Sequence, residues 1–90
     1  MDFEWDAKND ANIAKHGVSF EMAVGIFDRP VLTLFNRVTE YGETRQMSIG
    51  RLGDVVMLAV IHTDRDGRVR LISARPASRR ERKYYEQTLR

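Results

Sequence analysis

Short apolar runs separated by polar turn residues divide the chain into segments that predict either helices or strands. Two helices are expected near the N-terminus, the first over residues 7–16 and the second over residues 20–27. Asp6 is a suitable N-cap and Gly17 a suitable C-cap for the first helix, and Ser19 can cap the second. Helices this short are marginally stable alone, so we expect both to pack against another element.

Four runs of residues then predict the strands of a sheet. They cover residues 31–35, 43–51, 55–63 and 68–75. The third run is apolar throughout, which is typical of a central strand covered on both faces. Turns at residues 51–54 and at Asp66-Gly67 make the last three strands antiparallel neighbours.

A final helix follows the last strand. Ser78 and Glu81 form an S-x-x-E capping box, which predicts a helix running to about Thr88. We therefore expect an α+β domain with two N-terminal helices, a four-stranded, mainly antiparallel sheet and a C-terminal helix.

The composition restricts the possible chemistry. A chain of 90 residues makes one small domain, which we expect to span residues 1–90. It has no cysteine, so disulfides, thiolate catalysis and cysteine-based zinc sites are excluded. The two histidines, His16 and His62, lie in no metal-binding motif, and we expect neither a metal nor a cofactor.

The start of the chain and its hydropathy bear on its location. The first ten residues are acidic and polar, unlike a signal peptide. No apolar run approaches the roughly 20 residues that span a bilayer. We expect a cytoplasmic protein.

Charge is unevenly distributed. Residues 1–64 hold six Lys and Arg against ten Asp and Glu, whereas residues 65–90 hold nine against three. A basic C-terminal part indicates a polyanionic partner, although a solvated helix face has the same composition. A non-catalytic nucleic-acid-binding module is therefore an alternative to an enzyme, because binding needs only phosphate neutralisation.

The predicted hairpins indicate which polar residues share a face of the sheet. A two-residue turn at Asp66-Gly67 pairs His62 with Leu71, and strand alternation then gives Arg75 the same face as His62. The two side chains would lie about 13 Å apart, a gap that a short stretch of RNA can bridge.

The position of Arg45 depends on the turn within residues 51–54. A two-residue turn places Arg45 opposite His62 and on its face, whereas a three-residue turn moves Arg45 to the other face. Both possibilities remain open from the sequence.

Motifs along the whole chain resemble the BrnT family of type II toxin–antitoxin toxins. The opening "FEWDAKNDANIAKHGVSFEMAVGIFDRP" is similar to the start of that family. The stretches "ETRQMSIGR", "VIHTDRDGRVRLISAR" and "ASRRERKYYE" resemble its later strand, hairpin and final helix. Pro76 is a departure, because the family pattern has a basic residue there.

This resemblance implies a ribonuclease toxin with a small RelE-like domain, which cleaves RNA without a metal and so inhibits translation. It also implies a cognate antitoxin, a BrnA-like DNA-binding protein of the ribbon-helix-helix type. The antitoxin would hold the toxin inactive, and we expect the complex to be a heterotetramer that represses its own operon.

Metal-free RNA cleavage by the ribose 2′-OH needs a base, an acid and cations that stabilise the charge developing on phosphorus. His62 is usable as an acid or a base. Glu43 is an alternative base, although it could instead pair with Arg45. The expected catalytic residues are Arg45, His62 and Arg75, and the expected RNA-binding residues are Arg79, Arg82 and Tyr85.

Overall fold

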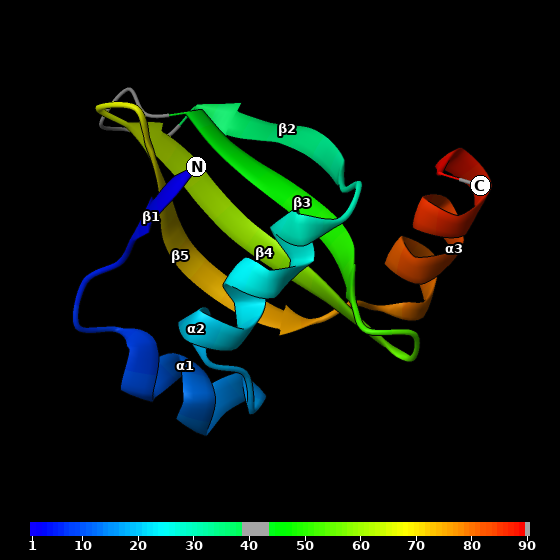
Figure 1. The fold of residues 1–90 in the computed structure, drawn as a ribbon, viewed down its shortest axis with the longest axis horizontal. Coiled ribbons are helices and arrows are strands. Elements are labelled where there is room, and N and C mark those ends of the chain that lie inside the picture. The colour runs from blue at the N-terminus through cyan, green and yellow to red at the C-terminus, as the bar shows by residue number, and fades with distance from the viewer. Residues whose placement is uncertain (39–43, 90) are drawn as a thin grey trace.

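A mixed sheet of five strands forms the centre of the computed structural model, which describes residues 1–38 and 44–89 (Figure 1). The strands are β1 (Asp2–Glu4), β2 (Leu32–Val38), β3 (Thr44–Leu52), β4 (Val56–Arg65) and β5 (Arg68–Pro76). The helices are α1 (Asn9–His16), α2 (Phe20–Ala23), the 3-10 helix η1 (Val24–Asp28) and α3 (Arg79–Thr88).

The predicted sheet is wrong in both strand number and type. The strand order in the structure is β1-β5-β4-β3-β2. Strand β1 pairs parallel with β5, where Phe3 lies opposite Val69. A three-residue strand is too short to show an alternating pattern, and its partner is 66 residues further along the chain. A four-stranded, mainly antiparallel sheet is therefore corrected to a five-stranded mixed one.

The N-terminal helices differ from the prediction in their limits. Lys8, not Asp6, occupies the N-cap position of α1, and Asp6 Oδ1 accepts a hydrogen bond from Lys8 N at 3.1 Å. Gly17 ends α1 in the left-handed conformation with φ 72°, and the Ser19 side chain caps α2 as expected. The predicted second helix is α-helical only to Ala23 and continues as η1.

The two faces of the sheet pack against different helices. On the face that we call the N-helix face, Leu58, Val60 and Ala74 are buried with residues of α2 and η1. On the opposite face, the α3 face, Ile49 and Ala59 are buried against α3. Figure 1 shows α1 and α2 lying across one face while α3 stands at one end of the sheet. Strand β4 is thus buried on both faces, as predicted.

The side chain of Asn12 completes the edge of the sheet where β1 stops. β1 ends at Glu4, opposite Arg70, so on this edge the next part of β5 has no neighbouring strand among the described residues. There the Asn12 amide donates to Ala74 O at 2.8 Å and accepts from Ala74 N at 3.1 Å, as a neighbouring strand residue would. It also donates to Val18 O at 2.7 Å, and the two bonds to Ala74 hold α1 against β5.

None of the helices in the described part of the chain has the length and apolar character needed to cross a membrane.

Candidate nucleic-acid interface

A β-bulge separates His62 from Arg75. His62 pairs with Leu71, as predicted, but the register shifts between Ile61 and His62 and leaves Ile72 without an opposite residue. Arg75 consequently pairs with Ala59, which lies on the α3 face. The predicted shared face of His62 and Arg75 is therefore wrong, because one extra residue reverses the alternation.

The turn between β3 and β4 moves Arg45 to the same face as Arg75. Leu52 pairs with Val56, so the turn has three residues, and Gln46 rather than Arg45 lies opposite His62. Arg45 thus lies on the α3 face. Relative to the predicted arrangement with a two-residue turn, both Arg45 and Arg75 have moved to the α3 face. The two arginines still share a face, while His62 lies on the N-helix face. Glu43, the alternative base, lies outside the described residues.

His62 is a buried residue of the N-helix face. It is 4% exposed, its Nε2 lies 2.7 Å from Ser48 Oγ, and the ring of Phe27 meets it edge-on with centroids 5.5 Å apart. Its Nδ1 is enclosed without a hydrogen-bond partner in the structure. Burial lowers the pKa of His62 below its ordinary value of 6.5, although the charge of Asp64 opposes this effect.

Acidification is expected to destabilise the protein through His62. Its pKa is lower in the folded than in the unfolded state, so the unfolded state binds more protons as the pH falls below about 6.5. Urea unfolding at pH 7.5 and pH 5 should show a loss of stability in wild type and a smaller loss in His62→Gln. Equal losses in both proteins would assign the pH dependence to other groups.

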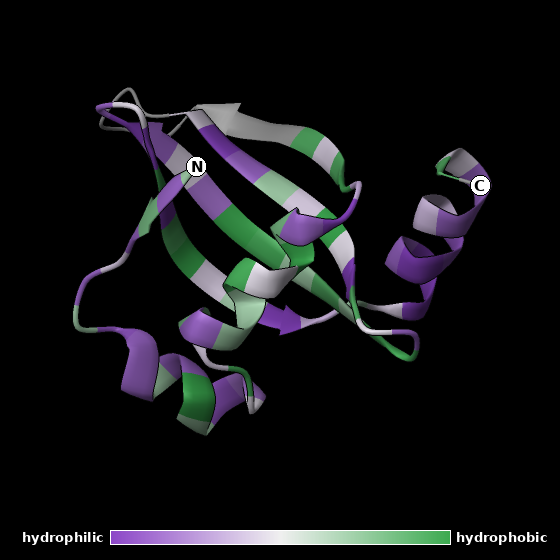
Figure 2. Ribbon diagram, in the orientation of Figure 1, coloured by the Kyte–Doolittle hydropathy of each residue, from purple (hydrophilic) through white to green (hydrophobic). Residues whose placement is uncertain are grey.

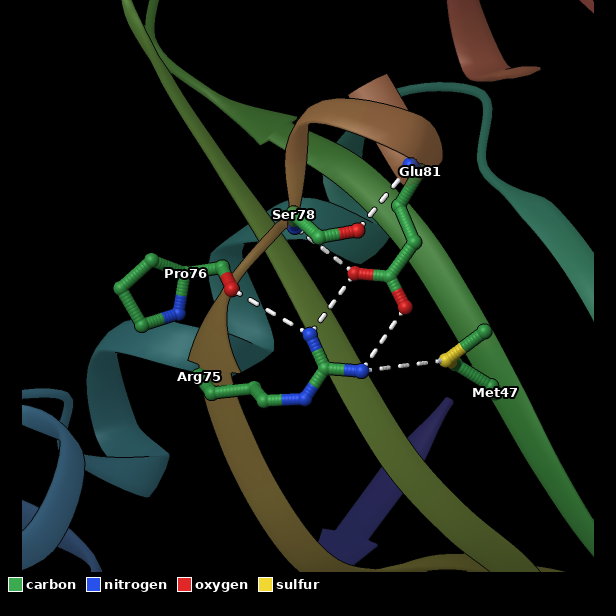
Figure 3. Close-up of polar contacts among 5 residues, drawn as sticks. All are labelled: Met47, Arg75, Pro76, Ser78 and Glu81. Atoms are coloured by element: carbon green, nitrogen blue, oxygen red, sulfur yellow. Dashed lines mark hydrogen bonds and ion pairs between the residues drawn. The ribbon is translucent and has the colours of Figure 1, made fainter. Parts of the chain in front are cut away.

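Arg75 is held in a fixed position by the start of α3 (Figure 3). Its two terminal nitrogens each lie 2.7 Å from one carboxylate oxygen of Glu81. Glu81 also accepts from Ser78 N at 2.8 Å, and Ser78 Oγ accepts from Glu81 N, so the predicted capping box is confirmed. The bonds from Arg75 lower the pKa of Glu81 to about 2, and the pKa of Arg75 is raised. This ion pair joins α3 to β5 and leaves Arg75 with a neutralised charge.

Arg45 lines a hollow of about 430 Å³ at the other end of the α3 face. It makes no hydrogen bond or ion pair with the described residues, and its Nε is enclosed without a partner. A guanidinium nitrogen enclosed without a hydrogen-bond partner among the described residues is costly, so the hollow favours an anion. We call it the arginine pocket, and it is lined by Asp6, Lys8, Arg45, Thr63, Arg65, Arg70, Leu71 and Ile72.

The first turns of α3 carry exposed cations, and Figure 2 shows the helix as mostly hydrophilic. None of them has an ion pair within residues 1–38 and 44–89. Positive charge is unfavourable at the start of a helix, where the dipole already presents positive charge. The cations are Arg79, Arg80, Arg82 and Lys83.

Tyr85 differs from the other predicted RNA-binding residues, because it is only 6% exposed. Its hydroxyl donates to Pro30 O at 3.0 Å, and the guanidinium of Arg51 lies 5.8 Å from the centroid of its ring. The adjacent Tyr84 is 50% exposed. An RNA contact by Tyr85 stays a prediction, whereas Tyr84 is accessible.

Sequence reasoning did not include Lys8, Thr63 and Arg70 among the candidate site residues. Thr63 and Arg70 pair across β4 and β5, and Lys8 enters from the segment between β1 and α1. The alternation of Arg68 and Arg70 with apolar residues was a usable signal, whereas nothing local indicated that Lys8 would reach the sheet. In the part of the chain that the structure describes, no group of three or more His, Asp or Glu side chains could hold a metal ion.

Comparison with known proteins gives a family and a similar solved structure. A family model described as "Ribonuclease toxin, BrnT, of type II toxin-antitoxin system" matches residues 5–81. The crystal structure of the Brucella abortus ribonuclease toxin BrnT is similar, with a TM-score of 0.59 and 28% sequence identity. That similarity covers 88% of this chain and 99% of the Brucella chain. No curated protein matches the sequence.

Proposed function

Because the chain belongs to the BrnT family of type II toxin–antitoxin ribonuclease toxins, we propose that it cleaves RNA on the α3 face of its sheet. The observation that supports this position most strongly is the guanidinium of Arg45, which lines the arginine pocket and has no ion pair with residues 1–38 or 44–89. Arg75 lies on the same face, four rows away along β4, or about 13 Å in the strand direction.

The proposed reaction is attack by a ribose 2′-OH on the adjacent phosphorus, without a metal. The 2′-oxygen loses its proton and bonds to phosphorus, the bond to the 5′-oxygen breaks, and that oxygen takes up a proton. The products are a 2′,3′-cyclic phosphate and a 5′-hydroxyl end. Arg45 stabilises the charge that develops on the phosphate oxygens, because its planar guanidinium can grip two of them.

His62 is left out of the proposed site. It is buried on the N-helix face and hydrogen-bonded to Ser48, so it cannot contact RNA bound beside Arg45 without unfolding. We assign both proton transfers to water. Arg75 is proposed to contact the RNA backbone near the cleaved bond while Glu81 fixes its orientation.

The start of α3 extends the proposed RNA-binding surface. Arg79 and Arg82 are proposed to bind backbone phosphates, which would relieve the repulsion between these side chains and the helix dipole.

An assay with purified protein and RNA tests this function. We expect cleavage that persists in EDTA and stops when the nucleotide before the cleaved bond carries a 2′-O-methyl group. Cleavage lost in EDTA would contradict a metal-free reaction. RNA binding without cleavage, even with translating ribosomes present, would indicate the alternative, a non-catalytic nucleic-acid-binding module.

The same assay tests the proposed partner, a BrnA-like ribbon-helix-helix antitoxin. Adding it in equimolar amounts should stop cleavage and restore protein synthesis in a translation extract. Light scattering should then give the mass of a heterotetramer with two copies of each chain. Continued cleavage in a complex of that mass would show that the partner does not neutralise the toxin.

A further inference from the structure

The arginine pocket has a wall that comes from the N-terminus of the chain. Arg45 and Thr63 reach it from β3 and β4, and Arg70 from β5, whereas Asp6 and Lys8 belong to the segment between β1 and α1. The short strand β1 holds this segment against β5 through its parallel pairing. The pocket is therefore assembled from residues that lie far apart in the sequence.

Two carboxylates fix one of the cations in the pocket. Arg70 Nη1 lies 2.6 Å from Glu4 Oε2, and Arg70 Nη2 lies 3.5 Å from Asp6 Oδ2. Glu4 also lies 3.8 Å from Arg68. The charge of Arg70 is thus neutralised from the protein side, so it serves as part of the frame.

Lys8 and Arg45 differ from Arg70 because neither has an ion pair with a described residue. Arg45 is half-buried with its Nε enclosed, and Lys8 is exposed. Asp6 bonds the backbone of Lys8, not its ammonium group, which leaves that group available at the pocket. A half-buried guanidinium and an exposed ammonium that line the same pocket are complementary donors for one phosphate group.

We propose that the arginine pocket binds a phosphate group of the RNA backbone, and that Lys8 is a substrate-positioning residue at its rim. This inference rests on the proposed function, since it takes the ligand to be RNA. The volume of the arginine pocket is in the range of small-ligand pockets. Lys8 contributes its charge equally before and during the reaction, so it lowers KM more than it raises kcat.

The test compares Lys8→Met with Lys15→Met, which removes the same charge from an exposed position that does not line the pocket. Lys8 makes no side-chain cap bond, so its replacement should leave α1 intact. NMR titration with inorganic phosphate, at constant ionic strength set with sodium chloride, should shift the amides of residues 44–45 and 70–72. Lys8→Met should weaken this binding about tenfold, and Lys15→Met should leave it unchanged.

The RNA measurement gives a second readout. Lys8→Met should raise KM about tenfold with kcat nearly unchanged, Lys8→Arg should restore KM, and the salt slope of RNA binding should fall by about 0.7. Cleavage by wild type with an unaltered KM in Lys8→Met would overturn the pocket proposal and leave the proposed function intact. Phosphate binding that depends on Lys8, in a protein that cleaves no RNA, would uphold the pocket as an anion site and overturn the proposed function.

Discussion

Replacing Arg45 by alanine is expected to lower kcat for RNA cleavage by about 10²–10³, the usual cost of losing one donor to a developing oxyanion. Its guanidinium has no ion pair or hydrogen bond among the described residues. It can therefore bind the phosphate oxygens as charge develops on them in the transition state. Arg45→Lys keeps the charge but loses the two-pronged grip, and it should recover only part of the rate. Single-turnover cleavage measures these rates without a contribution from product release.

Stability distinguishes this catalytic role from a structural one. Because Arg45 is half-buried and has no partner in the described part of the chain, its removal should leave the melting temperature unchanged or raise it slightly. Arg29→Ala is a matched control, since Arg29 is exposed and pairs only with Asp54 at 3.7 Å and Gly53 O. Arg45→Ala that cleaves within threefold of wild type would remove Arg45 from the reaction.

Replacing Asn12 by alanine is expected to reduce the free energy of unfolding by about 3–5 kcal/mol. The change removes four hydrogen bonds of the Asn12 amide, with Val18 O, Ala74 O, Ala74 N and, at 3.4 Å, Ser73 Oγ, and it takes this partner from the three backbone groups. The loss should appear as a lower urea midpoint with a nearly unchanged slope.

Two further variants sharpen this result. Asn12→Asp keeps the shape and the acceptor for Ala74 N, but it places a carboxylate against two carbonyl oxygens, so it should be at least as destabilising. Lys15→Ala, on the same helix but exposed, should change stability by less than about 0.5 kcal/mol. A loss below 1 kcal/mol in Asn12→Ala would mean that water replaces the amide at this edge.

Local signals in the sequence predicted the features that depend on a few neighbouring residues. The Asp66-Gly67 hairpin, the left-handed Gly17 and the capping box of Ser78 and Glu81 all occur in the structure. Each is determined by backbone conformation or by a hydrogen bond within three or four residues. The motifs quoted for the family were also sufficient to indicate that family, because they are dispersed over most of the chain.

Features that depend on distant residues could not be predicted. Strand β1 exists because Phe3 packs beside Val69, and the bulge at Ile72 is not visible in a sequence pattern that assumes strict alternation. The bulge and the three-residue turn each shifted one arginine by one position. Each shift moved its arginine to the α3 face, so Arg45 and Arg75 still share a face. Only His62 was separated from them.

The pairing of β1 with β5 also sets the order in which the molecule can be completed during synthesis. Asp2, Phe3 and Glu4 are translated before their partners at residues 68–70, which are made 66 residues later. At ribosomal speed this delay is on the order of ten seconds. Until then Lys8 has no β5 to lie against, and the arginine pocket lacks Arg70. A nascent toxin is therefore expected to be inert until residues 68–72 have been translated.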